Sequence, residues 1–76
     1  MTTTVRPHEI VAAEVRAELA RRKIPQSGLV GVLHMSEVSV SRRLRGETPF
    51  DINELVAVAD FLGVPIATLL PVGAAA

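Results

Sequence analysis

The sequence predicts an all-α fold in which five helices form one compact domain. Apolar residues recur at intervals of three or four positions, which is the spacing of one face of an α-helix. Proline or glycine separates most of the segments that show this spacing, His34-Met35 separates the second from the third, and no segment alternates apolar and polar residues as a β-strand does. With 76 residues and no cysteine, the chain allows one domain that neither disulfides nor a thiolate metal site can stabilise.

The first predicted helix covers residues 8–23. Its apolar stripe, expected to face the core, consists of Ile10, Val11, Val15 and Leu19. The opposite side is charged and expected to face solvent; its residues are Glu14, Arg16, Glu18 and Arg21. Pro25 ends this helix, because a proline disfavours the helical conformation in the residue before it.

Two shorter helices follow, separated by a few residues. The second predicted helix runs from Pro25 or Gln26 to Leu33. The third covers residues 36–45, with Ser36 suited to cap its N-terminus and Gly46 suited to end it. Two helices joined by such a short turn are typical of a helix-turn-helix, whose second helix enters the major groove of DNA.

The fourth predicted helix begins at Asp51 and ends at Gly63, and Glu54 completes a capping box with Asp51. Its expected apolar face consists of Ile52, Leu55, Val56, Ala59 and Leu62. A fifth, short helix is predicted from Pro65 to Leu70. Residues 8–70 are therefore expected to form the domain, with a flexible arm at 1–7 and a flexible tail at 71–76.

The charges of the chain are unevenly distributed although they sum to zero. Residues 1–46 contain all eight basic residues and four acidic ones, about +4, whereas residues 47–76 contain four acidic residues and no base, about −4. One face of the domain can therefore meet a polyanion while the other meets a partner.

The outward face of residues 36–45 carries the candidate DNA contacts. Winding this helix at about 100° per residue places its polar and basic residues opposite Val40 and Leu44. We expect base contacts from Glu37, Val38, Ser41 and Arg42, because a guanidinium can donate to guanine, a carboxylate can accept from cytosine and valine can contact a thymine methyl group. Arg43 and Arg45 are suited to phosphate contacts.

The chain from Val15 to Leu70 resembles the lambda-repressor/Cro-like helix-turn-helix family, also called the xenobiotic-response-element family. The matching segments are Ile24-Pro25-Gln26, Val32-Leu33, Met35 to Arg42, Arg45-Gly46-Glu47 and Leu62 to Leu70. The resemblance implies a five-helix domain that binds operator DNA as a dimer, with a phosphate contact from Gln26. Further backbone contacts are expected from Ser27, Ser36, Ser39, Arg45 and Thr48. Pro25, Arg43 and Glu47 depart from the usual residues of the family. By analogy alone, the composition is similar to that of small phage or prophage regulators.

The C-terminal part is richer in apolar residues than a thin domain needs, which favours a homodimer. The expected dimer interface consists of Phe61, Val64, Ile66, Leu69 and Leu70. A protein partner of another kind is a second possibility.

Other classes of function find little support. The two histidines, His8 and His34, lack carboxylates at ligand spacing, and no Gly-x-Ser-x-Gly motif or glycine-rich phosphate loop is present. We expect no metal, no cofactor and no catalysis. Because no apolar run approaches 18 residues and no signal-peptide core occurs, a cytoplasmic protein without membrane contact is expected.

Two hypotheses follow from these observations. The first is a sequence-specific, double-stranded DNA-binding transcriptional regulator, a repressor that binds its operator as a homodimer through residues 36–45. The second is a protein-interaction module of the same fold, such as an antitoxin, an anti-repressor or a factor that docks on the transcription machinery.

Overall fold

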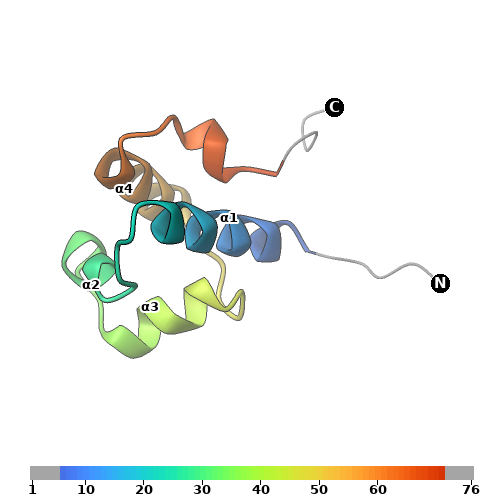
Figure 1. Ribbon diagram of the computed structural model, residues 1–76. Helices are drawn as coiled ribbons and strands as arrows, with labels where there is room; N and C mark the ends of the chain where they lie inside the picture. The colour runs from blue at the N-terminus through green and yellow to red at the C-terminus, as the bar shows by residue number, and fades with distance from the viewer. Residues whose placement is uncertain (1–5, 72–76) are drawn as a thin grey trace.

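The computed structural model describes residues 6–71 of the chain, and every element within that range is helical. Its elements are α1 (Pro7–Arg21), α2 (Gly28–Leu33), α3 (Glu37–Leu44), α4 (Ile52–Leu62) and the 3-10 helix η1 (Ile66–Leu69). In Figure 1, α1 lies in the middle, with α3 on one side and α4 and η1 on the other. The all-α prediction is confirmed, but the described part contains four α-helices rather than five.

Helix α1 begins one residue earlier and ends two residues earlier than predicted. Pro7 occupies its first turn, and the Glu9 side chain accepts a hydrogen bond from the Arg6 amide at 2.9 Å. Lys23 adopts a left-handed conformation with φ of 56°, and its amide donates to the Ala20 carbonyl at 3.1 Å. The end of α1 therefore has the left-handed C-cap that glycine usually provides, but here the left-handed residue is Lys23.

Helix α2 is shorter than predicted at its N-terminus. The amides of Gly28, Leu29 and Val30 donate to the carbonyls three residues earlier, so residues 25–27 form a tighter turn rather than the first turn of an α-helix. The left-handed His34 ends α2, and residues 34–36 connect it to α3. The predicted helix-turn-helix is therefore present in the fold.

Helix α4 begins and ends as the sequence predicts. Asp51 and Glu54 form the capping box, with hydrogen bonds of 2.7 and 3.0 Å, and Gly63 ends the helix with φ of 72°. The predicted fifth helix is instead η1, a 3-10 turn of four residues. So short an apolar segment, flanked by Pro65 and Pro71, offers too few backbone hydrogen bonds to extend an α-helix.

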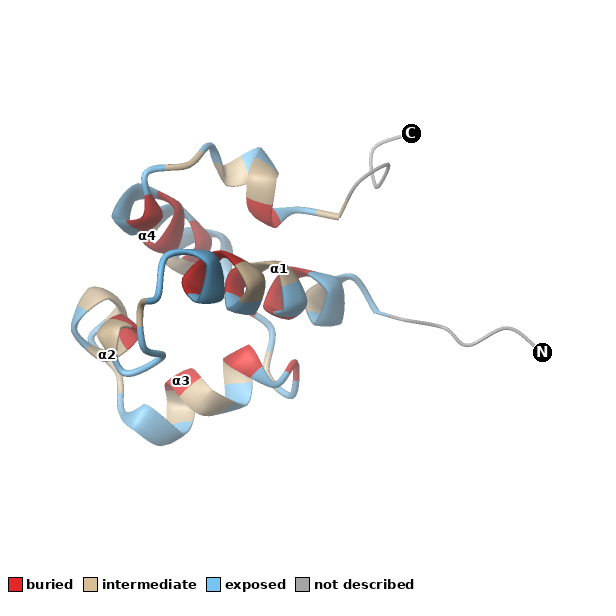
Figure 2. Ribbon diagram, in the orientation of Figure 1, coloured by how far each residue is buried: buried red, intermediate tan, exposed pale blue. Residues whose placement is uncertain are grey.

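The core lies between α1 and the four segments around it (Figure 2). Its buried hydrophobic residues are Val11, Val15, Leu19, Leu29, Val40, Leu44, Phe50, Leu55, Val58, Ala59, Leu62 and Leu69. Two predictions for α4 were wrong, because Ile52 and Val56 are 62% and 46% exposed while Val58 is buried. Helix α4 packs against α2 and η1, and its buried residues are Leu55, Val58, Ala59 and Leu62.

Two further expectations about burial were also wrong. Ile10 is exposed rather than part of the core. Glu18 is buried rather than on the solvent-facing side, and its carboxylate accepts hydrogen bonds from Arg21 and Arg22. Burial of a carboxylate is tolerated here because two cations within one helical turn compensate its charge.

The predicted arm and tail lie almost entirely outside the described residues. Of the arm, only residues 6 and 7 are described, and Pro7 belongs to α1. Of the tail, only Pro71 is described. Within residues 6–71, no helix is both long enough and apolar enough to cross a membrane.

Candidate nucleic-acid interface

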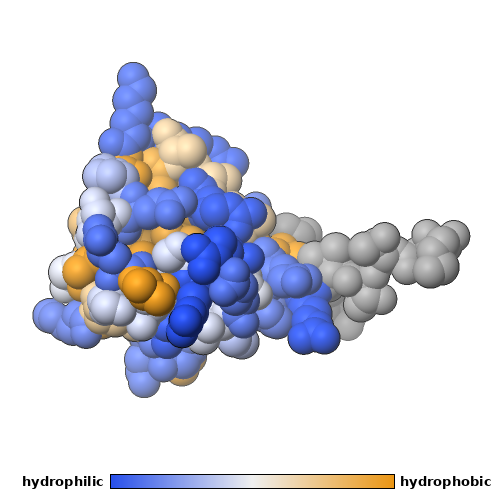
Figure 3. Space-filling view, turned by 90° about the horizontal axis from the view of Figure 1, so that it is seen from below, coloured by the Kyte–Doolittle hydropathy of each residue, from blue (hydrophilic) through white to orange (hydrophobic). Residues whose placement is uncertain are grey.

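Helix α3 has one side buried against the core and one side exposed at the surface of the domain. Val40 and Leu44 are buried against the core, whereas Glu37, Val38 and Arg42 are exposed. Val38 is 58% exposed, so an apolar side chain stands among the charged and polar residues of this face. Figure 3 shows the molecule from below, from the side on which α3 lies in Figure 1, and hydrophilic residues cover much of that surface. The exposure predicted for these three residues is confirmed, while their contact with bases stays a prediction.

The N-terminus of α3 is fixed by its own serine residues. The Ser36 hydroxyl accepts a hydrogen bond from the Ser39 amide at 3.2 Å, which caps the helix as the sequence predicts. The Ser39 hydroxyl lies 3.2 Å from the same oxygen. This cap orients Glu37 and Val38, which occupy the first turn of α3.

A hollow separates α2 from α3 on the same face. Its volume is about 200 Å³, and its lining residues are Gln26, Ser27, Val30, Glu37, Val40 and Ser41. Gln26 and Ser27, predicted to contact phosphates, are exposed at its α2 side. The helix-turn-helix therefore places two predicted phosphate contacts next to two predicted base contacts, Glu37 and Ser41.

Arg43 lies on a different side of α3 from the predicted contacts. Its Nε donates to Glu54 Oε1 at 2.9 Å, and its Nη1 donates to the Ser39 carbonyl at 3.2 Å. Both side chains of the ion pair are mostly buried, with 19% and 15% of their surfaces exposed. Because its guanidinium is bonded to α4, Arg43 contributes to the packing of the domain, and its phosphate contact stays a prediction.

Arg45 lies at the C-terminal end of α3, next to the predicted base contacts. Its Nε donates to Glu47 Oε2 at 2.7 Å, and its Nη1 donates to the Ser41 hydroxyl at 2.5 Å. The hydrogen bond from Arg45 lowers the pKa of the Glu47 carboxyl below its usual value and raises the pKa of Arg45. Both side chains are more than half exposed, so this ion pair belongs to the candidate interface.

Arg16 connects α1 to the end of α3. Its guanidinium donates to the carbonyl oxygen of Leu44, one of the last carbonyls of α3, which has no partner within the helix. A cation at this end also interacts favourably with the helix dipole. Arg16 therefore fixes the C-terminal end of α3 relative to the core.

Comparison with known proteins identifies the family of the chain. Residues 7–76 match the model of the BetR domain. The chain belongs to the BetR domain family. No curated protein matches its sequence closely enough to count as a relative.

Two solved structures are similar to this BetR domain. One is the crystal structure of the DNA-binding domain of BldD, which is 25% identical, with a TM-score of 0.74 over 91% of this chain and 100% of that one. The other is the S. venezulae BldD DNA-binding domain, which is 27% identical, with a TM-score of 0.70 over 84% of this chain and 96% of that one. The resemblance to the lambda-repressor/Cro-like family and a phage origin stay predictions.

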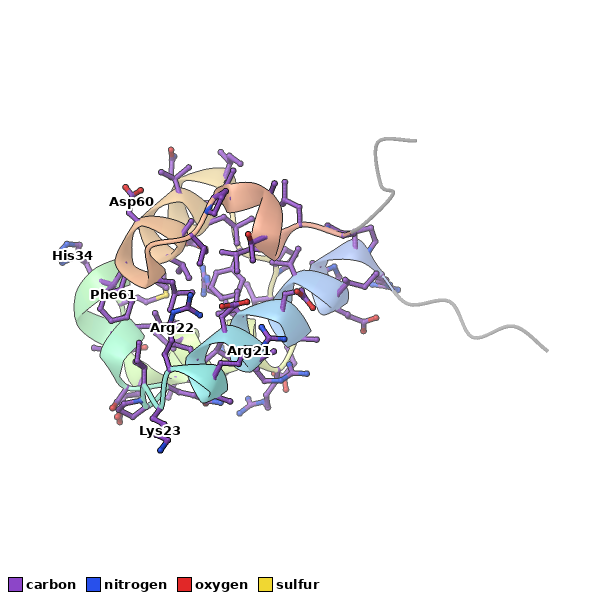
Figure 4. The ribbon with its side chains drawn as sticks, turned by 45° about the horizontal axis from the view of Figure 1, so that its top comes forward. Arg21, Arg22, Lys23, His34, Asp60 and Phe61 are labelled. Carbon is purple, nitrogen blue, oxygen red and sulfur yellow. The ribbon has the colours of Figure 1, made fainter. Side chains whose placement is uncertain are left out.

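The predicted dimer residues of the BetR domain differ in how far they are exposed. Phe61 and Leu70 are exposed, and Val64 and Ile66 are partly buried. Leu69 was wrongly assigned to an interface, because it is fully buried within the chain itself. Figure 4 shows Phe61 at the end of the domain where Arg22 and Lys23 follow Arg21, the last residue of α1.

Sequence reasoning about this BetR domain missed two residues that position the candidate interface, Arg16 and Glu54. Arg16 lies 28 residues from the carbonyl that it contacts, and Glu54 lies 11 residues from Arg43. The local pattern of α1 indicates only that Arg16 faces solvent. The one local signal for Glu54, its place in a capping box, does not show that the same oxygen also contacts α3.

Proposed function

We propose that this chain is a sequence-specific, double-stranded DNA-binding transcriptional regulator that represses by occupying an operator. The exposed face formed by Glu37, Val38 and Arg42 on α3 carries this proposal. A helix of eight residues is about 12 Å long and fits a major groove about 12 Å wide. The similarity to the DNA-binding domain of BldD supports DNA as the partner.

Each residue of the proposed interface has a distinct role. Arg42 donates to guanine, Glu37 accepts from the cytosine amino group, and Val38 contacts a thymine methyl group. Ser41 offers a hydroxyl to the same base edges. The backbone contacts come from Gln26, Ser27, Ser36, Ser39, Arg45 and Thr48, and they position α3 without specifying sequence.

We further propose that the chain binds its operator as a homodimer. One helix of eight residues contacts too few base pairs for a unique operator, whereas a two-fold dimer contacts two half-sites about 34–36 Å apart. Phe61 and Leu70 are the exposed apolar residues of the predicted interface. Repression then follows because the bound dimer prevents polymerase from occupying the same DNA.

Selection of bound duplexes from a random library tests this proposal. An inverted repeat with half-sites about one helical turn apart is the expected outcome. Enrichment of one unrepeated half-site would contradict the homodimer but not DNA binding. No enrichment, together with no gel shift at 50 or 200 mM salt, would contradict the proposed function.

The protein-interaction module remains the second candidate because acidic residues compensate cations near α3. Glu54 binds Arg43 and Glu47 binds Arg45, which lowers the positive charge available to DNA. A DNA-binding protein loses affinity steeply between 50 and 200 mM salt, since that loss follows the number of phosphates neutralised. A protein-binding module gives no gel shift at either concentration.

A further inference from the structure

Glu47 forms an ion pair with the guanidinium of Arg45, a group that the candidate interface offers to phosphate. Arg45 donates from Nε and Nη2 to the two carboxylate oxygens of Glu47, at 2.7 and 3.3 Å, and from Nη1 to the Ser41 hydroxyl at 2.5 Å. Every nitrogen of this guanidinium therefore already has an acceptor within the chain. The paired geometry is the one in which guanidinium also binds a phosphate group.

The backbone at the end of α3 determines where Glu47 lies. Gly46 adopts a left-handed conformation with φ of 79°, and the Glu47 amide then donates to the Arg42 carbonyl at 2.9 Å. This closure turns the chain back at the end of α3 and places the carboxylate beside Arg45.

We propose that Glu47 competes with DNA phosphate for Arg45 and thereby weakens binding to DNA of any sequence. The inference rests on the proposed function. A phosphate that approaches Arg45 must displace the carboxylate or accept a negative charge beside it, and both reduce the gain from the contact. Because phosphate contacts are independent of sequence, base contacts by Glu37, Val38 and Arg42 then determine which sites are occupied.

The test compares the full chain with Glu47→Gln, using gel shifts on a duplex of arbitrary sequence at several salt concentrations. We expect Glu47→Gln to bind more tightly and to gain about one phosphate contact. Between 50 and 200 mM salt, Glu47→Gln should then lose about 3.5-fold more affinity than the unchanged chain, which is the loss expected for one additional phosphate contact. Circular dichroism verifies that the helices are retained.

Asp60→Asn is the matched control because it changes the net charge by the same amount. Asp60 is exposed on α4, and Figure 4 shows its side chain pointing outward from the domain. This variant should leave the salt dependence unchanged. An equal change in Asp60→Asn and Glu47→Gln would overturn the inference, because the effect would then come from net charge alone.

Arg45→Gln is introduced into the unchanged chain and into Glu47→Gln. The comparison tests whether Arg45 is the cation that gains the phosphate contact. Arg45→Gln should weaken DNA binding in both backgrounds, but by a larger factor in Glu47→Gln, where no carboxylate competes with phosphate for Arg45, so that the gain is cancelled. Equal effects in both backgrounds would contradict competition. If the chain binds DNA but Glu47→Gln changes nothing, this inference alone fails; if neither protein binds any duplex, the proposed function fails with it.

Discussion

Arg43 and Glu54 join the helix proposed to contact DNA to the start of the next helix. The Glu54 Oε1 atom accepts from Arg43 Nε at 2.9 Å and from the Asp51 amide at 3.0 Å. One carboxylate oxygen thus serves both the capping box of α4 and the ion pair with α3. The orientation of α3 therefore depends on a residue outside the helix-turn-helix.

Removing this ion pair should destabilise the domain without changing its contacts with phosphate. Because the pair is largely buried, Arg43→Ala should lower the free energy of unfolding by about 1–3 kcal/mol. Urea denaturation of Arg43→Ala, Glu54→Ala and the double variant measures the coupling between the residues. If Arg43→Ala instead keeps its stability but reduces the salt dependence of DNA binding, Arg43 contacts phosphate after all.

Arg16 should stabilise the last turn of α3. Arg16→Ala leaves the Leu44 carbonyl without its guanidinium donor, at an expected cost of about 1 kcal/mol. Hydrogen exchange should become faster at the Arg45 amide, which bonds to Ser41, and stay unchanged in α4. Arg16→Lys retains the charge and should show a smaller effect; an effect as large as that of alanine would show that charge contributes little.

Two glycine substitutions should change stability in opposite directions. Gly46→Ala puts a residue with a side chain into a left-handed backbone conformation and places its Cβ 3.4 Å from a Glu9 side-chain carbon. The free energy of unfolding should therefore fall by about 1–2 kcal/mol. Gly31 lies within α2 with no neighbouring atom within 4 Å of an added Cβ, so Gly31→Ala should stabilise by up to about 1 kcal/mol. Thermal unfolding of both variants measures these effects, and a shift in the same direction would refute the distinction.

The carboxyl group of Glu47 should titrate at lower pH than it does without Arg45. Its pKa in the folded chain lies below the ordinary value of 4.5, so the ionised form favours folding. The ionised carboxylate stabilises the fold fully above pH 4.5, and this stabilisation is lost as the pH falls through the lowered pKa. Carbon-detected NMR titration of the chain and of Arg45→Gln measures this, and we expect the Glu47 pKa to rise in the variant. The same pKa in both proteins would exclude the ion pair in solution.

Arg42→Ala should weaken operator binding in a sequence-dependent manner. Loss of the guanine contact should cost about 1–3 kcal/mol and relax the preference at one base pair. Gln26→Ala, which removes a proposed phosphate contact, should weaken binding to all sequences nearly equally. Footprints and affinities that Arg42→Ala leaves unchanged at constant salt would refute the proposed role of α3.

Features that depend on residues close together in the chain could be predicted from the sequence. The spacing of Val40 and Leu44 predicted the buried side of α3, and therefore the exposure of Val38 and Arg42. The caps formed by Ser36 and Asp51 require contacts only three residues apart, so composition and spacing suffice to predict them.

Contacts between residues far apart in the chain could not be predicted from the sequence. The direction of Arg43, the contact of Arg16 with α3 and the exposure of Ile52 all follow from how separate helices pack. Helical periodicity indicates that a face is apolar or charged, but it contains no information about which element will cover that face. For this reason the sequence predicted the exposed face of α3 correctly but did not predict the contact of Arg43 with α4.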